Sequence, residues 1–299
     1  MTNSEKIRRK ALSLGFDLCG IARCRSLERQ YDRFKNWLAD GCDGGLEYLR
    51  RNTGKRVDPG ALCEGARSVI VCGVGYHRPP SAHEVASRIA SYAHSRDYHL
   101  TIRERLNELS AYLRELVPGA SGRVFTDTAP LAEKSWAVEA GLGWIGRNSL
   151  LANPRLGSFL LLGEVVTTAE LESDAPFVRD GCGTCRACVD ACPVAAIRPD
   201  RTIDAGRCIS RRTIEAGDGD EGDLHGWLFG CDVCQRACPY NRKAPVSVHD
   251  SFAPLAELER LDIDDWLGLD EAGFRRIFGE TPLARCGLRR LQERIRRLK

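Results

Sequence analysis

The spacing of apolar residues predicts several helices in the first half of the chain. Apolar and charged residues alternate at helical intervals over residues 4–14, and shorter stretches at 34–38 and 46–49 continue this pattern. Residues 102–116 carry isoleucine or leucine at positions that fall on one helical face, which is typical of an amphipathic helix. Residues 133–140 complete the predicted helices of this half.

Three apolar runs predict strands. Residues 67–75 form a β-branched run that ends in glycine, residues 121–130 contain a second candidate, and residues 158–168 read SFLLLGEVVTT. A glycine-rich loop at 141–149 precedes the third run. The succession of strand, helix and strand predicts a mixed layer of helices on a sheet.

The composition changes at two points and predicts three parts. The first part covers residues 1–172 and ends at a polar, proline-containing linker; residues 173–245 hold most of the cysteines; residues 246–299 form a helical extension. In that extension, residues 285–299 contain seven basic residues and one glutamate. They are predicted to form a helix with one packed face and one basic face, which is either simply solvated or a contact for a phosphate backbone.

Composition and charge describe an ordinary globular protein. The chain has 299 residues, 44 Lys and Arg against 41 Asp and Glu, and 43% hydrophobic residues. The start of the chain has Asp17 inside its only apolar stretch and no cleavage site for export, and no apolar run is long enough to span a membrane. We therefore expect a cytoplasmic protein, without a membrane partner.

The distribution of the 14 cysteines is the strongest chemical signal in the chain. Eight of them fall within residues 182–238, and in a reducing compartment such clustering favours metal binding over disulfides. The run CGTCRACVDACP at 182–193 has the spacing of a bacterial ferredoxin, in which three cysteines hold one cluster and the fourth, followed by proline, reaches a second. The second motif is CDVCQRACP at 231–239, and one further cysteine stands between the two motifs.

Because the last cysteine of each motif reaches the cluster of the other motif, the eight cysteines divide into two sets of four, one for each predicted 4Fe-4S cluster. The first set is Cys182, Cys185, Cys188 and Cys238, and the second set is Cys192, Cys208, Cys231 and Cys234. Paired C-x2-C motifs also bind zinc, but a three-cysteine run closed by C-P is not a zinc-ribbon spacing. The remaining cysteines are scattered and are predicted to be small core residues: Cys19, Cys24, Cys42, Cys63, Cys72 and Cys286.

The first part of the chain is larger than electron storage requires, so we expect it to hold a substrate or a further cofactor. Polar stretches at 95–99, 126–134 and 141–149 are candidates for its site. The glycines of the last stretch do not open a helix directly after a strand, which argues against a dinucleotide site.

Together with the cysteines, these stretches resemble the epoxyqueuosine reductase family, cobalamin-dependent iron-sulfur enzymes of tRNA modification that are related to reductive dehalogenases. The resemblance rests on DPGALCEGARSVIVCGVGY at 58–76, RDYHLTIRERL at 96–106, the long stretch at 127–168 that begins DTAPLAEKSW, and GCDVCQRACPYNR at 230–242. It implies an α+β fold: an α/β cobalamin-binding domain like that of the reductive dehalogenases, followed by a ferredoxin-like module with two 4Fe-4S clusters.

The resemblance also implies the chemistry. In the family the clusters reduce cobalt, the low-valent cobalt reduces the epoxide of epoxyqueuosine at the tRNA wobble position, and water is lost to give queuosine. By the family's D-[ST]-A-P motif, Asp127 is the general acid, for which a partly desolvated carboxyl with a raised pKa is expected. The residues implied to line the corrinoid site are Arg56, Asp97, Tyr98, His99, Asn148, Ser149 and Ser158, while Lys134 and Arg147 are candidates for tRNA phosphates or plain surface charges.

Longer family members continue with a helical-repeat domain that helps to hold tRNA, so we expect a short form that relies on residues 285–299 and on the pocket face. We expect a monomer that receives electrons from a donor of the flavodoxin or ferredoxin type. Two alternatives stay open at this point: a corrinoid reductase for an organohalide or a small epoxide, and an electron-transfer protein without catalysis.

Overall fold

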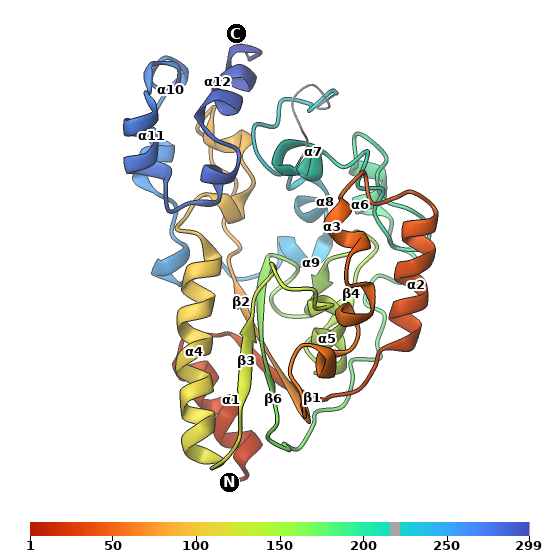
Figure 1. Ribbon diagram of the computed structural model, residues 1–299. Helices are drawn as coiled ribbons and strands as arrows, with labels where there is room; N and C mark the ends of the chain where they lie inside the picture. Colours follow the sequence, from red (N-terminus) through yellow and green to blue (C-terminus); the bar gives the residue numbers. More distant parts are fainter. Residues whose placement is uncertain (216–221, 299) are drawn as a thin grey trace.

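A four-stranded antiparallel sheet forms the centre of the computed structural model, which describes residues 1–215 and 222–298 (Figure 1). Its strands follow the order β1 (Leu18–Arg23), β2 (Ser68–Gly75), β6 (Leu160–Thr167) and β3 (Gly122–Phe125). Each neighbouring pair is antiparallel. Strands β2 and β3 therefore run in the same direction, but β6 lies between them.

Helices cover both faces of this sheet because side chains alternate between the faces along each strand. On one face, α1 (Asn3–Ser13) and α4 (Tyr98–Leu116) pack against apolar residues such as Val165 of β6 (Figure 1). On the other face, α5 (Glu133–Glu139) brings Trp136 against Leu162 and Val166. The two faces thus bury separate apolar cores on either side of β6.

The structure confirms the predicted helices at the start of the chain, at 102–116 and at 133–140, and the strands at 67–75 and 158–168. Three features differ from the prediction. Strand β1 was missed because its six residues include glycine and cysteine, and β3 ends at Phe125, where the chain turns. The predicted glycine-rich loop at 141–149 contains β4 (Trp144–Ile145), which forms a short hairpin with β5 (Leu151–Ala152) just beyond it.

The predicted helical stretches at 34–38 and 46–49 lie in α2 (Glu28–Ala39) and α3 (Glu47–Arg50). The described residues also form short 3-10 turns, which are η1 (Thr53–Arg56), η2 (Pro59–Ala61), η3 (Ala86–Arg88), η4 (Ser91–Ala93), η5 (Asp250–Phe252), η6 (Ala256–Glu259) and η7 (Pro282–Arg285). None of the helices in the described part of the chain has the length and apolarity that crossing a membrane requires.

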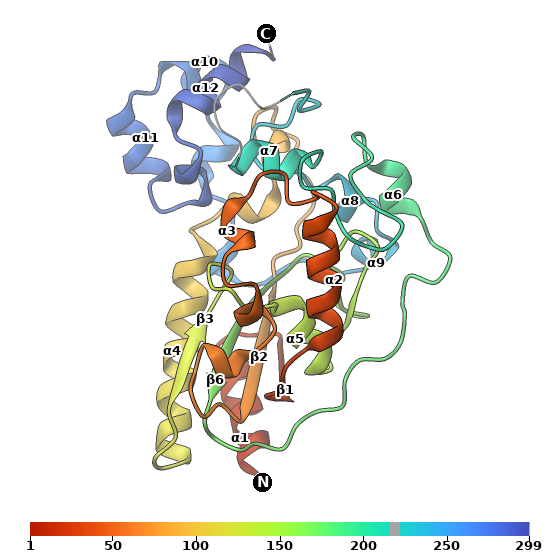
Figure 2. The same cartoon turned by 45° about the vertical axis from the view of Figure 1, so that its right-hand side comes forward.

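An extended linker connects the sheet domain to the cysteine-rich segment, which packs beside the sheet. Residues 170–180 form neither helix nor strand and run along the outside of the molecule (Figure 2). Asp174 anchors this linker, since it accepts hydrogen bonds from the Ile21 backbone N–H and from Arg8. The segment beyond it contains the short helices α6 (Ala187–Ala191), α7 (Ile209–Glu215), α8 (Val233–Arg236) and α9 (Pro239–Arg242).

The C-terminal helices close a third apolar core. These helices are α10 (Ile263–Gly268), α11 (Glu271–Phe278) and α12 (Leu288–Arg296), and they lie together at one end of the molecule (Figures 1 and 2). Their apolar residues pack against residues 85–93 and against Leu228 and Phe229. This core therefore joins all three predicted parts of the chain, whose boundaries stay a prediction.

The basic helix at the C-terminal end is confirmed as α12, but its basic face is smaller than predicted. Arg294 is buried and donates hydrogen bonds to the backbone oxygens of Thr213 and Leu228, at 3.0 and 2.6 Å. Arg294 therefore supplies hydrogen-bond donors to buried carbonyls and does not belong to the basic surface of the helix. Lys299 lies outside the described residues.

Candidate active site

A cavity of about 870 Å³ lies between the sheet domain and the cysteine-rich segment. The loop that follows β3 forms one wall, and residues of α2, including Phe34 and Trp37, form another. Thr202 and Ile203 line it from the cysteine-rich segment, and Arg285 lines it from the C-terminal part. All three parts of the chain therefore contribute to this cavity.

Asp127 stands on the loop where β3 ends, at the wall of this cavity. Its backbone is left-handed, with φ of 54°, which is unusual for a residue other than glycine. The preceding Thr126 is buried and donates its hydroxyl to the backbone oxygen of Leu162 at 3.0 Å, which fixes the start of the loop. About half of the Asp127 side chain, 51%, is exposed, and it faces the cavity.

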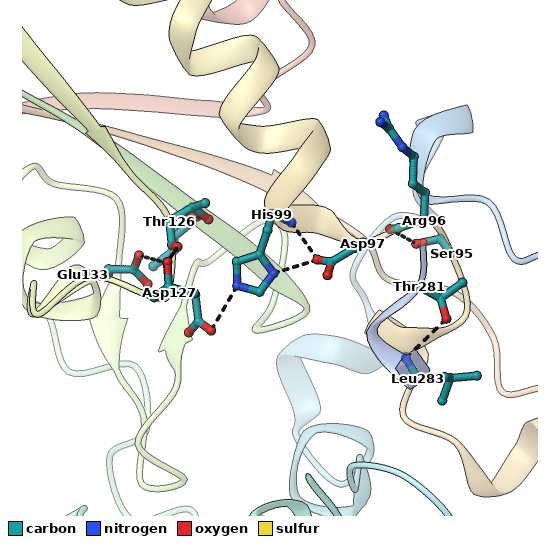
Figure 3. A network of polar contacts seen from close by, with 11 residues as sticks. Ser95, Arg96, Asp97, His99, Thr126, Asp127, Glu133, Thr281 and Leu283 are labelled. Carbon is teal, nitrogen blue, oxygen red and sulfur yellow. Dashed lines mark hydrogen bonds and ion pairs between the residues drawn. The ribbon is translucent and has the colours of Figure 1, made fainter. Parts of the chain in front are cut away.

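The start of α4 brings His99 against Asp127 (Figure 3). Asp97 caps this helix by accepting the backbone N–H of His99 at 2.9 Å, and its carboxylate also lies 2.6 Å from the His99 Nδ1. The Nε2 on the other side of the ring lies 3.3 Å from Asp127 Oδ2. Tyr98 stacks on the imidazole, with ring centroids 4.1 Å apart. The imidazole is thus held between two carboxylates.

These contacts set the protonation of the group. Burial alone would lower the pKa of His99, but the hydrogen bonds to Asp127 and Asp97 outweigh it and raise this pKa to about 9. The same hydrogen bond to His99 lowers the pKa of Asp127 against the opposing effect of burial. The expectation of a raised pKa for Asp127 is therefore wrong, because a cationic partner outweighs desolvation here.

Two further carboxyls lie behind Asp127. Glu133 falls within the candidate stretch at 126–134 but was given no role, and Glu164 was not singled out from the sequence. Glu133, in the first turn of α5, accepts a short hydrogen bond from the Asp127 backbone N–H (Figure 3). Glu164, on β6, is completely buried. Burial raises the pKa of both carboxyls, that of Glu133 to about 7. The sequence did carry a signal, since a glutamate inside the apolar strand LLLGEVVT is rare unless it is paired.

The residues implied to line a corrinoid divide into two groups. Arg56, Asn148 and Ser149 line the cavity directly. Asp97, Tyr98 and His99 stand behind Asp127 instead. His99 and the Tyr98 hydroxyl both contact the Asp127 carboxylate, and Asp97 contacts the other nitrogen of the imidazole.

The structure does not bring Ser158 to the cavity, contrary to expectation. Ser158 is buried, its backbone N–H donates to Asn241 at 2.6 Å, and its hydroxyl donates to Gln235 at 3.2 Å. Ser158 follows the β4–β5 hairpin and lies where the sheet domain meets α8 and α9. It therefore fastens the cysteine-rich segment to the sheet rather than lining the cavity.

Lys134 and Arg147 both make contacts within the chain. Lys134 Nζ donates to the backbone oxygen of Ser149 at 2.7 Å, and Arg147 donates to the backbone oxygen of Gly183 at 2.7 Å. Arg147 thus ties the loop at 146–149 to the first cysteine motif.

The eight clustered cysteines lie in two groups of four. Burial and then the charges of Cys182, Cys238 and Cys185 raise the pKa of Cys188, so these four thiols are near neighbours. In a second group, burial and the charges of neighbouring thiols raise the pKa of Cys208, Cys231 and Cys234. Cys192 completes this group, since its charge is among those that act on Cys208 and Cys231.

Cys234 of the second group lies near both the first group and the cavity. Cys234 also lies within electrostatic range of Cys188, and it accepts a hydrogen bond from the side chain of Asn148, which lines the cavity. Trp144 Nε1 lies 3.4 Å from the Cys182 sulfur on the other side. In the first group Cys185 is exposed to solvent.

The donor set fits clusters better than single ions. Over residues 1–215 and 222–298, no three His, Cys, Asp or Glu side chains lie close enough to hold one metal ion. A 4Fe-4S cluster does not require this, because each of its four thiolates binds a different iron. Of the six scattered cysteines, Cys42, Cys63, Cys72 and Cys286 are buried, as predicted for core residues.

Comparisons with known proteins agree with this architecture. Residues 56–128 match the family model described as Epoxyqueuosine reductase QueG, DUF1730, and residues 181–241 match a 4Fe-4S double cluster binding domain. An epoxyqueuosine reductase of Cyclobacterium marinum is 40% identical over 98% of this chain and 96% of its own length.

Two solved structures have the same fold. An epoxyqueuosine reductase with a tRNA-Tyr epoxyqueuosine-modified stem loop superposes with a TM-score of 0.87 at 26% identity, over 97% of this chain and 79% of that one. The Bacillus subtilis epoxyqueuosine reductase, with its catalytic aspartate loop swung out of the active site, gives the same values. The chain belongs to the epoxyqueuosine reductase family of oxidoreductases, and its cysteine-rich segment is a double 4Fe-4S cluster domain.

Proposed function

We propose that this chain reduces epoxyqueuosine in tRNA to queuosine, in the cavity that Asp127 lines. The observation that carries the proposal is the meeting of three elements at this cavity: the Asp127 loop, Asn148 with its bond to Cys234, and Thr202 of the cluster domain. A relative of the same fold has been crystallised with an epoxyqueuosine-modified tRNA stem loop. The overall change adds two electrons and two protons and releases the epoxide oxygen as water.

We assign each group of four cysteines to one cluster. The first cluster has Cys182, Cys185, Cys188 and Cys238 as ligands, and the second has Cys192, Cys208, Cys231 and Cys234. The proximity of the thiols within each group supports this assignment. The hydrogen bond from Asn148 to Cys234 makes the second cluster the one nearer the cavity, while the exposed Cys185 gives an electron donor of the flavodoxin or ferredoxin type access to the first.

The cavity also fits a corrinoid. It offers the aromatic surfaces of Phe34 and Trp37 for an apolar ring system, and the side chains of Asn148 and Ser149 for its amides. Arg56 lines it as well, and its buried Nε has no hydrogen-bond partner among the described residues, as expected of a group that awaits a ligand. When bound there, cobalamin supplies a redox-active metal centre, and the two clusters supply electrons one at a time.

Asp127 and His99 supply the proton for the leaving oxygen. Because the pKa of His99 is raised to about 9, the imidazole carries a proton at neutral pH, and Asp127 faces the cavity as its ion-pair partner. This proton moves from His99 Nε2 to Asp127 and from there to the epoxide oxygen as the C–O bond breaks, which leaves Asp127 ionised again and His99 neutral until it takes up a proton from solvent. Asp97 keeps the imidazole oriented through its contact with Nδ1. Asp127 is thus the catalytic acid, and Asp97 is a positioning residue.

The basic C-terminal segment contributes to tRNA binding. Arg285 lines the cavity, and Arg296 of α12 is exposed at the same end of the chain. We expect these arginines to contact the phosphates that flank the modified base. The protein acts as a monomer in the cytoplasm, where its tRNA substrate occurs.

The test is an anaerobic incubation of cluster-loaded protein with cobalamin, a strong reductant and epoxyqueuosine-containing tRNA, followed by mass analysis of the nucleosides. We expect queuosine, and a loss of about 10²–10⁴-fold in rate for Asp127→Asn, the usual contribution of general acid catalysis. Cobalamin that binds and is reduced without queuosine formation would point to another substrate, such as an organohalide or a small epoxide. Full turnover by Asp127→Asn would refute the role of Asp127.

A further inference from the structure

The carboxyl of Glu164 occupies an apolar site in the middle of the central sheet. It projects from β6 on the face that α5 covers, and its cross-strand neighbours are Val71 of β2 and Phe125 of β3. The side chain is completely buried, and neither of its oxygens meets an N–H or O–H donor among the described residues. An ionised carboxylate is strongly disfavoured in such a site, so Glu164 must hold a proton.

The polar group that Glu164 does meet is a second carboxyl, that of Glu133. The two side chains lie at hydrogen-bonding distance from one another. Two ionised carboxylates have no donor between them, so the contact exists only if a proton is shared. Burial, then the charge of Glu133 and the hydrogen bond to it, raise the pKa of Glu164. Burial and the charge of Asp127 raise the pKa of Glu133, while its hydrogen bond to Glu164 lowers it.

Glu133 in turn holds the backbone of Asp127. Its Oε1 accepts the Asp127 N–H, and this bond spans the turn in which Asp127 adopts its left-handed conformation (Figure 3). Such a conformation costs free energy for any residue with a side chain and persists only where the surroundings impose it. A chain of hydrogen bonds therefore runs from Glu164 through Glu133 to the backbone of the catalytic loop.

We propose that Glu133 and Glu164 share one proton and together latch the Asp127 loop into the cavity. This inference deepens the proposed function and rests on it. Both glutamates are positioning residues, because the bond ends on the backbone of Asp127 and not on its carboxylate. In the Bacillus subtilis relative the catalytic aspartate loop is able to leave its site, since one structure has it swung out of the active site.

Other titratable groups lie within electrostatic range of the pair. Burial raises the pKa of Cys72 and Tyr98, which are therefore neutral, so the charges that bias the shared proton are those of Asp127 and Lys134. Cys72 lies on β2, Tyr98 begins α4, and Asp127 follows β3. Lys134 stands beside Glu133 on α5, and the positive charge of Arg33 on α2 lowers the pKa of Lys134. The negative charge of Asp127 favours retention of the shared proton, while Lys134 opposes it. Because Lys134 is held by the Ser149 carbonyl, its effect on the pair is fixed by the fold.

The first measurement detects the proton directly. The infrared carbonyl band of a protonated carboxylic acid is separate from the bands of carboxylates, and we expect such a band from the full-length, cluster-loaded protein at pH 8. It should disappear in Glu164→Gln. A spectrum that the substitution leaves unchanged would overturn the shared proton, and this test needs neither tRNA nor cobalamin.

The second measurement follows the loop. Hydrogen exchange of the amides at 126–132 should be accelerated at least about tenfold in Glu164→Leu, which leaves Glu133 without its donor. Glu164→Gln is the matched control: its amide N–H can donate to Glu133, so we expect protection close to that of the wild-type chain. Equal exchange in Glu164→Leu and Glu164→Gln would refute the latch even if one variant were less stable.

The third measurement separates the latch from the proposed function. With epoxyqueuosine-containing tRNA, Glu164→Leu should lower kcat while KM stays near the wild-type value, because Asp127 is misplaced and the substrate contacts remain. If the wild-type chain converts no epoxyqueuosine while the infrared and exchange results hold, the proposed substrate fails and the latch stands. If conversion occurs and the exchange result fails, only the latch is wrong.

Discussion

Replacing Asp127 by asparagine tests the ion pair on which proton delivery depends. The substitution keeps the size and shape of the side chain and removes its charge, while Asp97 stays in contact with the other nitrogen of His99. A rise in the His99 pKa from its ordinary 6.5 to about 9 corresponds to about 3 kcal/mol, which is the net of what the two carboxylates supply and what burial costs.

The part of this stabilisation that Asp127 contributes depends on how exposed its side chain is. An equal division of this net stabilisation would assign Asp127 between about 1 and 2 kcal/mol, and because half of its side chain faces a solvent-accessible cavity, screening brings its share to about 1 kcal/mol. We therefore expect Asp127→Asn to lower the pKa of His99 by about 1. The contacts of protonated His99 with its two carboxylates stabilise the folded chain fully below pH 6.5, the pKa of an ordinary histidine. This stabilisation is lost as the pH rises through about 9, because His99 then loses its proton in the folded chain too.

The assay is a titration of the histidine side chains by NMR in protein labelled at histidine, with the other five histidines as internal references. The His99 signals are assigned by their loss in His99→Gln. Asp97→Asn is the matched comparison, because it removes the other carboxylate and leaves Asp127 in place. A His99 titration that is the same in Asp127→Asn and in the wild-type chain would show that the 3.3 Å contact contributes no charge interaction, and the proposed route of the proton would fail.

Three further predictions concern the clusters and the packing. Cys238→Ala should reduce the iron content from about eight to about four per chain, and loss of all iron would argue against two separate ligand sets. Arg294→Ala should lower the free energy of unfolding by about 2–4 kcal/mol because it leaves two buried carbonyls without their donor. Arg296→Ala, at an exposed position, should change this free energy by less than about 0.5 kcal/mol. Denaturant unfolding measures both variants, and equal effects would contradict the burial of Arg294. Gly143→Ala should cost about 2 kcal/mol or more in the same assay, because a Cβ there would collide with the backbone oxygen of Ala152, and a neutral result would mean that the β4–β5 hairpin gives way easily.

The parts of the molecule that the sequence predicts best are those whose partners are close in sequence. The cysteine motifs use fixed two- and three-residue gaps, so their chemistry follows from spacing alone. Helix α4 and strand β6 are long and strongly patterned, and both were predicted close to their observed bounds. The short strand β1 has no such pattern, since only its pairing with β2 makes it a strand.

The candidate site was harder to predict because it joins distant residues. Asp127 was found through a family motif, but its pKa depends on His99, which reaches it from the start of α4. The Glu133–Glu164 contact depends on the packing of α5 on the sheet, which no local pattern encodes. Ser158 shows the opposite error, since a residue next to site residues in sequence lies in the interface with α8 and α9 instead.

The third apolar core also has a consequence for biogenesis. Residues 85–93 find their partners in α10–α12, about 200 residues later, so at a synthesis rate of about 5–20 residues per second they wait roughly 10–40 s for them on the ribosome. Leu228 and Phe229, which belong to this core, directly precede the cysteine motif at 231–238. Because about 60 residues follow Cys238, we expect the assembly machinery for iron-sulfur clusters to have its best access to these thiols in the last roughly 3–12 s of that interval, before the last helices close the core beside them.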